Sequence, residues 1–157
     1  MFHVNCLDET EPGTHETITV SGSYIPSYYF ANNQYIKKVI LDKDIYHIGI
    51  CAFMNCYNLE EIVFNEKLMS IESYAFYFCK SLKHLKFNKS LKKIGCNCFS
   101  LCFNILTINM SDCCIECLYD NTFISCVYLE EFKFNAKIKY FHKTSMPKHR
   151  FKYTVAV

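Results

Sequence analysis

Cysteine is the residue type with the most chemical potential in this chain, because eleven of the 157 residues carry a thiol. Thiolates bind zinc and thiols pair as disulfides, so their spacing decides what they can do. Four of them recur at intervals of 23, 23 and 24 residues, namely Cys56, Cys79, Cys102 and Cys126. This regular phase predicts a buried ladder of free thiols, each packing as a small hydrophobic side chain.

The other cysteines raise the question of a four-thiolate zinc site, for which the candidates are Cys96, Cys98, Cys113, Cys114 and Cys117. A zinc site needs ligands that converge on one point. Cys98 is expected to point into the core, whereas Cys114 and Cys117 flank the inward Ile115. We therefore predict no metal site and no cofactor. An odd number of cysteines also leaves at least one thiol unpaired, which argues against a disulfide framework.

A catalytic constellation is not evident among the remaining polar residues. The six histidines share no pattern with serine and aspartate that would supply a nucleophile, a base and an orienting group. Gly49 and Gly95 are isolated glycines rather than parts of a phosphate-binding loop. We predict no catalytic residue, and that the protein is not an enzyme.

The element that positions these side chains is an internal repeat. Phe30, Phe53, Phe76 and Phe99 lie 23 residues apart, and Phe123 and Met146 follow after 24 and 23 residues. The main apolar columns keep this period, as in the series Ile36, Leu59, Leu82, Ile105 and Leu129, and the series Val39, Ile62, Leu85, Ile108 and Phe132. Self-similarity at this period predicts a solenoid, because one unit cannot close a core and stacked copies can.

Within a unit, the alternation of residues 60–65 predicts a strand with Ile62 and Phe64 facing inward. The residue after each inward pair is a turn former, in the order Asp42, Asn65, Asn88, Ser111 and Asn135. We expect residues 73–79 and their equivalents to form a short helical or 3₁₀ turn on the opposite side.

Residues 48–56 and 94–102 both fit the pattern I-G-x-x-[small]-F-x-x-C. This pattern resembles the leucine-rich repeat of the BspA-like branch, and the resemblance covers roughly residues 18–146. It implies an α/β repeat solenoid with one parallel sheet and short helical or 3₁₀ turns on the other face. We divide the chain into a polar N-terminal arm at 1–17 and a repeat domain at 18–157. The domain holds about five to six units, and the last is degenerate, with Met146 and His149 in place of Phe and Cys.

The predicted binding face consists of the outward strand positions. One column holds Lys38, Glu61, His84, Thr107 and Glu131, and the next holds Ile40, Val63, Lys86, Asn109 and Lys133. Six strands of about four residues give a patch on the order of 300 Å². A standard interface buries about 800 Å² on each partner, so this face alone predicts weak or peptide-like binding.

These features predict a non-enzymatic protein–protein interaction module whose partner is another protein or peptide. The family resemblance implies an alternative, a cell-surface or host-interaction protein of adhesin type. A third hypothesis is the binding of an anionic ligand or nucleic acid by the basic block of residues 80–93. The mixed charge of the strand face argues against nucleic acid.

Charge and hydropathy suggest where the protein acts and how it assembles. Residues 1–70 hold 4 Lys and 9 acidic residues, a net charge of −5, and residues 71–157 carry +7. This asymmetry predicts self-association through the solenoid ends. No apolar stretch approaches the ~20 residues of a membrane span. Residues 1–9 lack the features of a signal peptide, which predicts an intracellular and cytoplasmic protein, with the cell surface as the alternative.

Overall fold

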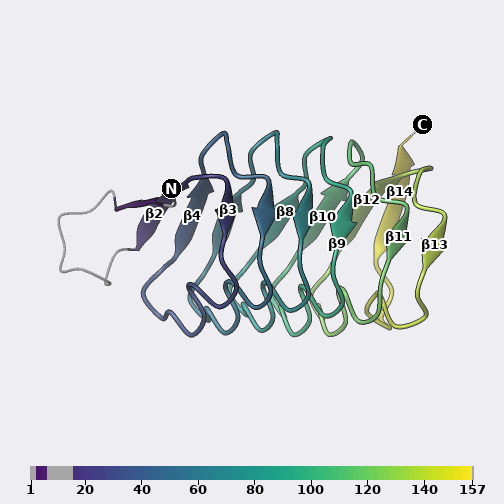
Figure 1. The fold of residues 1–157 in the computed structure, drawn as a ribbon. Helices are drawn as coiled ribbons and strands as arrows, with labels where there is room; N and C mark the ends of the chain where they lie inside the picture. The colour runs from purple at the N-terminus through teal and green to yellow at the C-terminus, as the bar shows by residue number, and fades with distance from the viewer. Residues whose placement is uncertain (1–2, 7–15, 157) are drawn as a thin grey trace.

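The computed structural model describes residues 3–6 and 16–156, which form an elongated β-solenoid of about six turns (Figure 1). Each turn contributes one strand to each of two ladders that run along the solenoid axis. The strands of the first ladder are β2 (Thr17–Ser21), β4 (Lys38–Leu41), β6 (Glu61–Val63), β8 (His84–Lys86), β10 (Thr107–Met110), β12 (Glu131–Asn135) and β14 (Lys152–Ala156). Those of the second are β3 (Tyr24–Ile25), β5 (His47–Ile48), β7 (Ser70–Ile71), β9 (Lys93–Ile94), β11 (Cys117–Leu118) and β13 (Tyr140–Phe141).

Pairing within both ladders is parallel, and its register follows the repeat columns. Thr107 pairs with Glu131 and with His84, as the sequence alignment of the units requires. The remaining strand, β1 (His3–Cys6), pairs antiparallel with β2 at the N-terminal side of the first ladder. It falls inside the predicted arm, whose residues 7–15 lie outside the described part. The division into arm and repeat domain stays a prediction.

Each ladder has one break in its strand pairing, and the two breaks lie at different levels. The first ladder divides between β6 and β8, and the second between β9 and β11. Next to the first break, β7 still pairs with β9, and next to the second, β8 still pairs with β10. The second break follows the extra residue between Met110 and Ile115. Because the breaks are staggered, continuous pairing in the other ladder spans each one.

The core is a column of stacked phenylalanines, which explains the strictest feature of the sequence. The rings of Phe30, Phe53, Phe76, Phe99 and Phe123 stack with centroids 5.0–5.5 Å apart and interplanar angles of 2–12°. Their spacing follows from the ~4.8 Å separation of neighbouring strands. Four of the five rings are fully buried, and Phe30 at the N-terminal end is 8% exposed.

The predicted helical or 3₁₀ turns are wrong, and so is the α/β assignment, because the described residues contain no helix. Five of the turns each contain two residues with positive φ, four positions apart, such as Cys51 (54°) and Asn55 (61°). Alternate N–H groups therefore leave the turn: those of Cys51, Phe53 and Asn55 donate to carbonyls of the next unit at 2.7–3.2 Å. A helix would direct every N–H to its own preceding turn. The turns thus form a third hydrogen-bonded ladder between the units.

The sequence hid these turns because bulky residues occupy several positive-φ positions. Tyr74, Phe78 and Leu101 have φ of 60°, 58° and 61°. Glycine and asparagine are the usual signals for this conformation, and a bulky residue there is an outlier. The equivalents in other units are the asparagines that would have given the signal, Asn32, Asn55, Asn97 and Asn121.

At the opposite edge, asparagine side chains connect consecutive units. Asn88 donates from Nδ2 to the carbonyl of Asn65, and its Oδ1 accepts the N–H groups of Ser90 and Leu91 at 2.9 and 2.8 Å. Asn135 repeats this pattern, with Nδ2 at 2.8 Å from the carbonyls of Ser111 and Cys113. The amide supplies both an acceptor and a donor, so one residue closes its own turn and ties it to the previous one.

Candidate functional site

The ten predicted binding residues lie on the outer face of β4, β6, β8, β10 and β12, in two adjacent columns. In each of these strands a buried residue separates the two outward ones, as in Glu61, Ile62 and Val63. Lys38 is in register with Glu61, and Ile40 with Val63. Across β8 and β10, Lys86 is in register with Asn109. The structure thus brings the two columns together as the sequence required, and their role in binding stays a prediction.

Most of these ten side chains bind one another. Lys38 and Glu61 form an ion pair of 2.9 Å, and Lys133 and Glu131 form one of 3.1 Å. Nδ1 of His84 lies 2.9 Å from the Thr107 hydroxyl. Oδ1 of Asn109 accepts hydrogen bonds from the Ser111 N–H at 3.0 Å and from the Ser111 hydroxyl at 2.8 Å. These groups would have to exchange existing contacts for those of a partner.

Three of the ten residues of the face form none of these contacts. Ile40 is half-buried and Val63 is 39% exposed, and the two are neighbours on β4 and β6. Lys86 continues the same column on β8, beyond the break in strand pairing, and is exposed. Within residues 3–6 and 16–156, no ion pair or side-chain hydrogen bond of Lys86 is found. The available chemistry of the face is therefore two aliphatic side chains followed by one cation.

Beside this face, ion pairs between units neutralise many of the acidic residues. Lys83 Nζ lies 2.9 Å from the Glu60 carboxylate, and this hydrogen bond lowers the pKa of Glu60. Lys67 is 2.7 Å from Asp44 and lowers the pKa of that carboxyl in the same way. Exposed pairs of this kind contribute little to stability. They do, however, determine which lysines remain available to a ligand.

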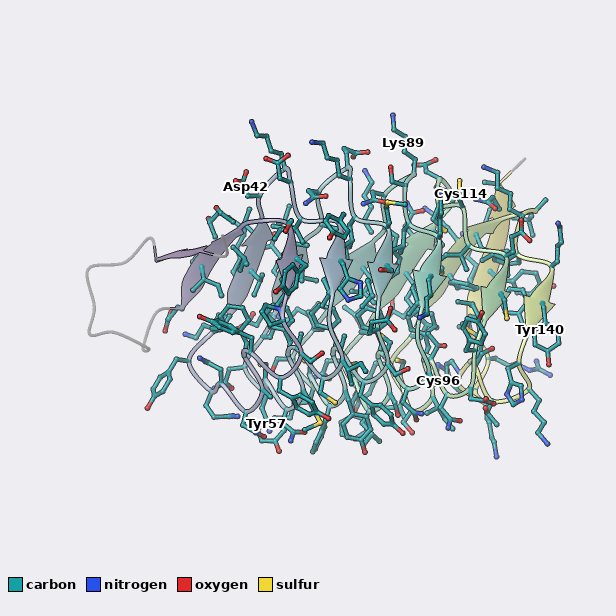
Figure 2. All side chains as sticks on the ribbon, in the orientation of Figure 1. Asp42, Tyr57, Lys89, Cys96, Cys114 and Tyr140 are labelled. Carbon is teal, nitrogen blue, oxygen red and sulfur yellow. The ribbon has the colours of Figure 1, made fainter. Side chains whose placement is uncertain are left out.

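The basic block at 80–93 is thus partly neutralised. Lys80 lies over the Tyr57 ring at 5.3 Å, and Lys93 pairs with Glu72 at 2.8 Å. In the described part of the chain, the lysines of the block with neither an ion pair nor a contact with an aromatic ring are Lys86, Lys89 and Lys92. Lys86 lies on the strand face, and Lys89 projects from the loop edge next to the asparagine series (Figure 2).

The four cysteines that recur with the repeat form the predicted buried ladder. The thiols of Cys56, Cys79 and Cys102 each donate at 3.1 Å to a phenylalanine carbonyl of the preceding unit, that of Phe30, Phe53 and Phe76 respectively. Cys126 does the same to Phe99 at 3.5 Å. Burial raises the pKa of all four thiols. The column therefore has a structural role, since each thiol binds a carbonyl inside the core.

The remaining cysteines do not converge. Cys98 is fully buried, and Cys114 and Cys96 lie at opposite edges of the solenoid (Figure 2). Among the described residues, no group of three or more Cys, His, Asp or Glu side chains could hold a metal ion. Cys114 instead lies 3.6 Å from the Lys137 ammonium.

Sequence reasoning missed a second outward column, which precedes the strands of the second ladder. Tyr46, Met69 and Lys92 occupy the same position of three consecutive units, and all three are exposed. The signal was present, since these residues keep the 23-residue period and two of them are apolar. It was overlooked because the sequence indicated only one sheet.

Comparison with known proteins identifies the family. The model of the BspA type leucine rich repeat region matches residues 23–152, in six copies. The chain belongs to this family. A search of curated proteins found no match. The described part of the chain contains no helix that could cross a membrane.

Solved structures show the same fold. A Treponema pallidum leucine-rich repeat protein is 18% identical, with a TM-score of 0.68 over 97% of this chain and 82% of its own. The pneumococcal vaccine antigen PcpA is 23% identical, with a TM-score of 0.65 over 84% of this chain and 32% of the antigen. A Bacteroides ovatus leucine-rich repeat protein is 15% identical, with a TM-score of 0.51 over 90% of this chain and 51% of its own.

Proposed function

We propose that this leucine-rich repeat protein is a non-catalytic interaction module that binds an extended segment of another protein across β4, β6 and β8. The observation that carries the proposal is the column Ile40, Val63 and Lys86, whose side chains are free of internal polar contacts in the described structure. It offers about 10 Å of aliphatic surface followed by a cation. A segment with apolar residues followed by a carboxylate complements it.

The internal pairs around this column support the same reading. Because Lys38 is bound to Glu61 and His84 to Thr107, a partner gains little by competing for them. A partner can bury Val63 and form an ion pair with Lys86 without breaking an existing polar contact of either residue. The small area of the column favours weak binding of a peptide segment over a large interface.

The test is selection of binding peptides from a random peptide library, followed by affinity measurement on variants. Val63→Lys should lower the affinity of selected peptides roughly tenfold or more, because it places a charge on the apolar surface. Lys86→Glu should have a similar effect on peptides with a carboxylate. Both positions are exposed, so folding should be unaffected.

Val127→Lys is the matched control, since Val127 is exposed on the turn edge, away from the first ladder. It makes the same chemical change and should leave peptide affinity unchanged. The proposal fails if selected peptides bind Val63→Lys and Lys86→Glu as tightly as the unchanged protein.

An intracellular site of action is part of the proposal, with the cell surface as the alternative. The buried thiols that donate to phenylalanine carbonyls favour a reducing compartment, since oxidation would remove these donors. The name of the pneumococcal antigen is the observation that favours the alternative, and at 23% identity it bears on the fold alone. Protection of the protein from protease added to intact cells would support the intracellular site, and digestion would contradict it.

A further inference from the structure

A hollow of about 540 Å³ lies on the loop edge, away from the strand face proposed to bind protein segments. It is lined by Tyr46, Lys67, Met69, Lys89, Ser90 and Lys92. Its volume falls within the range of small-molecule sites, about 300–1,000 Å³. The lining residues come from three consecutive units, so stacking of the units creates the hollow.

The charge of this hollow is entirely positive. Three of its six lining residues are lysines, and none is acidic. Lys67 is neutralised by Asp44 at 2.7 Å, whereas Lys89 and Lys92 have no ion pair within the described residues. The two lysines are three residues apart on the loop that leads into β9, with Ser90 between them. An anion placed here would contact two cations and meet no carboxylate of the lining.

The rest of the hollow is apolar and exposed. Tyr46 and Met69 occupy the same position of neighbouring units and are 48% and 42% exposed, and Lys92 is next in this column. An aromatic ring lying on them would gain contact with the tyrosine ring and the thioether. Inorganic phosphate alone would use the lysines and leave this surface in water.

We propose that this hollow binds an oxyanion attached to an aromatic group, of the aryl phosphate class, with the phosphate at Lys89 and Lys92 and the ring on Tyr46 and Met69. A phosphate monoester carries between one and two negative charges at neutral pH and matches the two lysines. Nucleic acid fits less well, because the neighbouring pairs Lys67–Asp44 and Lys93–Glu72 interrupt a basic track along the edge.

The test uses phenyl phosphate as the probe, with inorganic phosphate and phenol for comparison. Phenyl phosphate has about 11 non-hydrogen atoms, which sets an expected dissociation constant on the order of 1 mM at low salt. Binding is followed by the methyl NMR signals of the five methionines. The Met69 signal, identified with Met69→Leu, should shift more than those of Met54, Met110 and Met146.

The variant Lys89→Gln/Lys92→Gln should weaken phenyl phosphate binding roughly tenfold. The control is Lys43→Gln/Lys143→Gln, which removes the same charge from two exposed lysines that do not line the hollow. It should leave binding nearly unchanged, as should Val63→Lys on the strand face. Failure of this site is thus distinguishable from failure of the proposed protein-binding face.

Equal weakening by the two double variants would overturn the proposal, because it would indicate general attraction to a basic protein. Equal affinity for inorganic phosphate and phenyl phosphate, with no selective shift of Met69, would also overturn it. If the site is confirmed, a phosphotyrosine peptide separates two sources of the same chemistry. Tighter binding of the peptide than of phenyl phosphate indicates a modified protein, and equal binding indicates a free aryl phosphate.

Discussion

At the scale of single residues, the cysteine column shows how a reactive group becomes a structural one. The thiol of Cys56 donates to the carbonyl of Phe30 at 3.1 Å and is fully buried. Burial raises its pKa from 9.0 to about 12, because the thiolate would lose its hydration. At neutral pH the group is therefore a protonated donor and a poor nucleophile.

The raised pKa of Cys56 predicts how the stability of the protein changes at alkaline pH. Below the unfolded pKa of about 9 the contribution of the Cys56 thiol is complete. Between pH 9 and 12 the unfolded chain releases a proton that the folded chain retains, so stability falls by about 1.4 kcal/mol per pH unit for this thiol. The stability gap between the unchanged protein and Cys56→Ala should therefore shrink by about 2 kcal/mol between pH 7 and pH 10.5, as measured by urea unfolding.

The control for this prediction is Ile36→Val, which also removes buried volume and carries no titratable group. Its destabilisation, about 1 kcal/mol, should be the same at both pH values. A gap for Cys56→Ala that stays constant from pH 7 to 10.5 would show that the thiol does not titrate differently in the folded chain.

At the scale of elements, the turn is the feature that local sequence concealed. Residues of ordinary helical propensity adopt a conformation with alternating N–H directions, because this allows each turn to bond to its neighbour. The cost is positive φ at bulky residues, on the order of 1 kcal/mol each. Hydrogen bonds between units and the stacked phenylalanines offset that cost.

The turn geometry predicts different effects on stability for two similar substitutions. Leu101 is half-buried with φ of 61°, and Leu106 is half-buried without a positive φ. Leu101→Asn loses apolar contact but relieves the backbone strain, because asparagine tolerates positive φ. The stability of this variant should therefore stay within about 0.5 kcal/mol of that of the unchanged protein. Leu106→Asn has no such relief and should cost about 1 kcal/mol or more.

Urea unfolding of the two variants measures this difference in stability. The comparison requires that the unfolding free energy of both variants depends on urea concentration with the same slope. A loss for Leu101→Asn equal to that for Leu106→Asn would mean that the positive φ carries no strain that asparagine can relieve.

At the scale of the whole molecule, three hydrogen-bonded ladders hold the units in line, formed by the two sets of strands and by the turns. The C-terminal side of the described structure shows β14 and β13, with Tyr153 68% exposed and Tyr140 at the end of the solenoid (Figure 2). The C-terminal half is also basic and the N-terminal half acidic, with net charges of +7 and −5.

We predict that the chain self-associates head to tail, with opposite charges and exposed strand edges as the cause. Light scattering should give a larger mass at low salt than at 0.5 M salt, because the Debye length falls to a few ångströms. Tyr153→Glu should lower the mass at low salt, because it places a negative charge at the basic end, and Tyr128→Glu, at a similarly exposed tyrosine on the turn edge, should not. A monomer under both conditions would contradict the prediction.

The sequence by itself determined the solenoid, its register and its core. Phenylalanine, cysteine and aliphatic columns at one period leave only one arrangement in which all of them are buried, so Phe53, Phe76 and Cys79 lie where the repeat places them. The ten residues of the binding face followed from the same alternation, since neighbouring strand residues point to opposite sides.

Only the tertiary structure decided which of those ten residues are free, because internal pairing of Lys38 with Glu61 depends on side chains 23 positions apart. It also decided the turns, since Phe78 adopts a positive φ against its local preference in order to bond to Ser100 of the next unit. The hollow of Tyr46, Met69, Lys89 and Lys92 belongs to no single unit. Contacts between units produce all three features, and a period read along the chain records only which residues recur, not which of them meet.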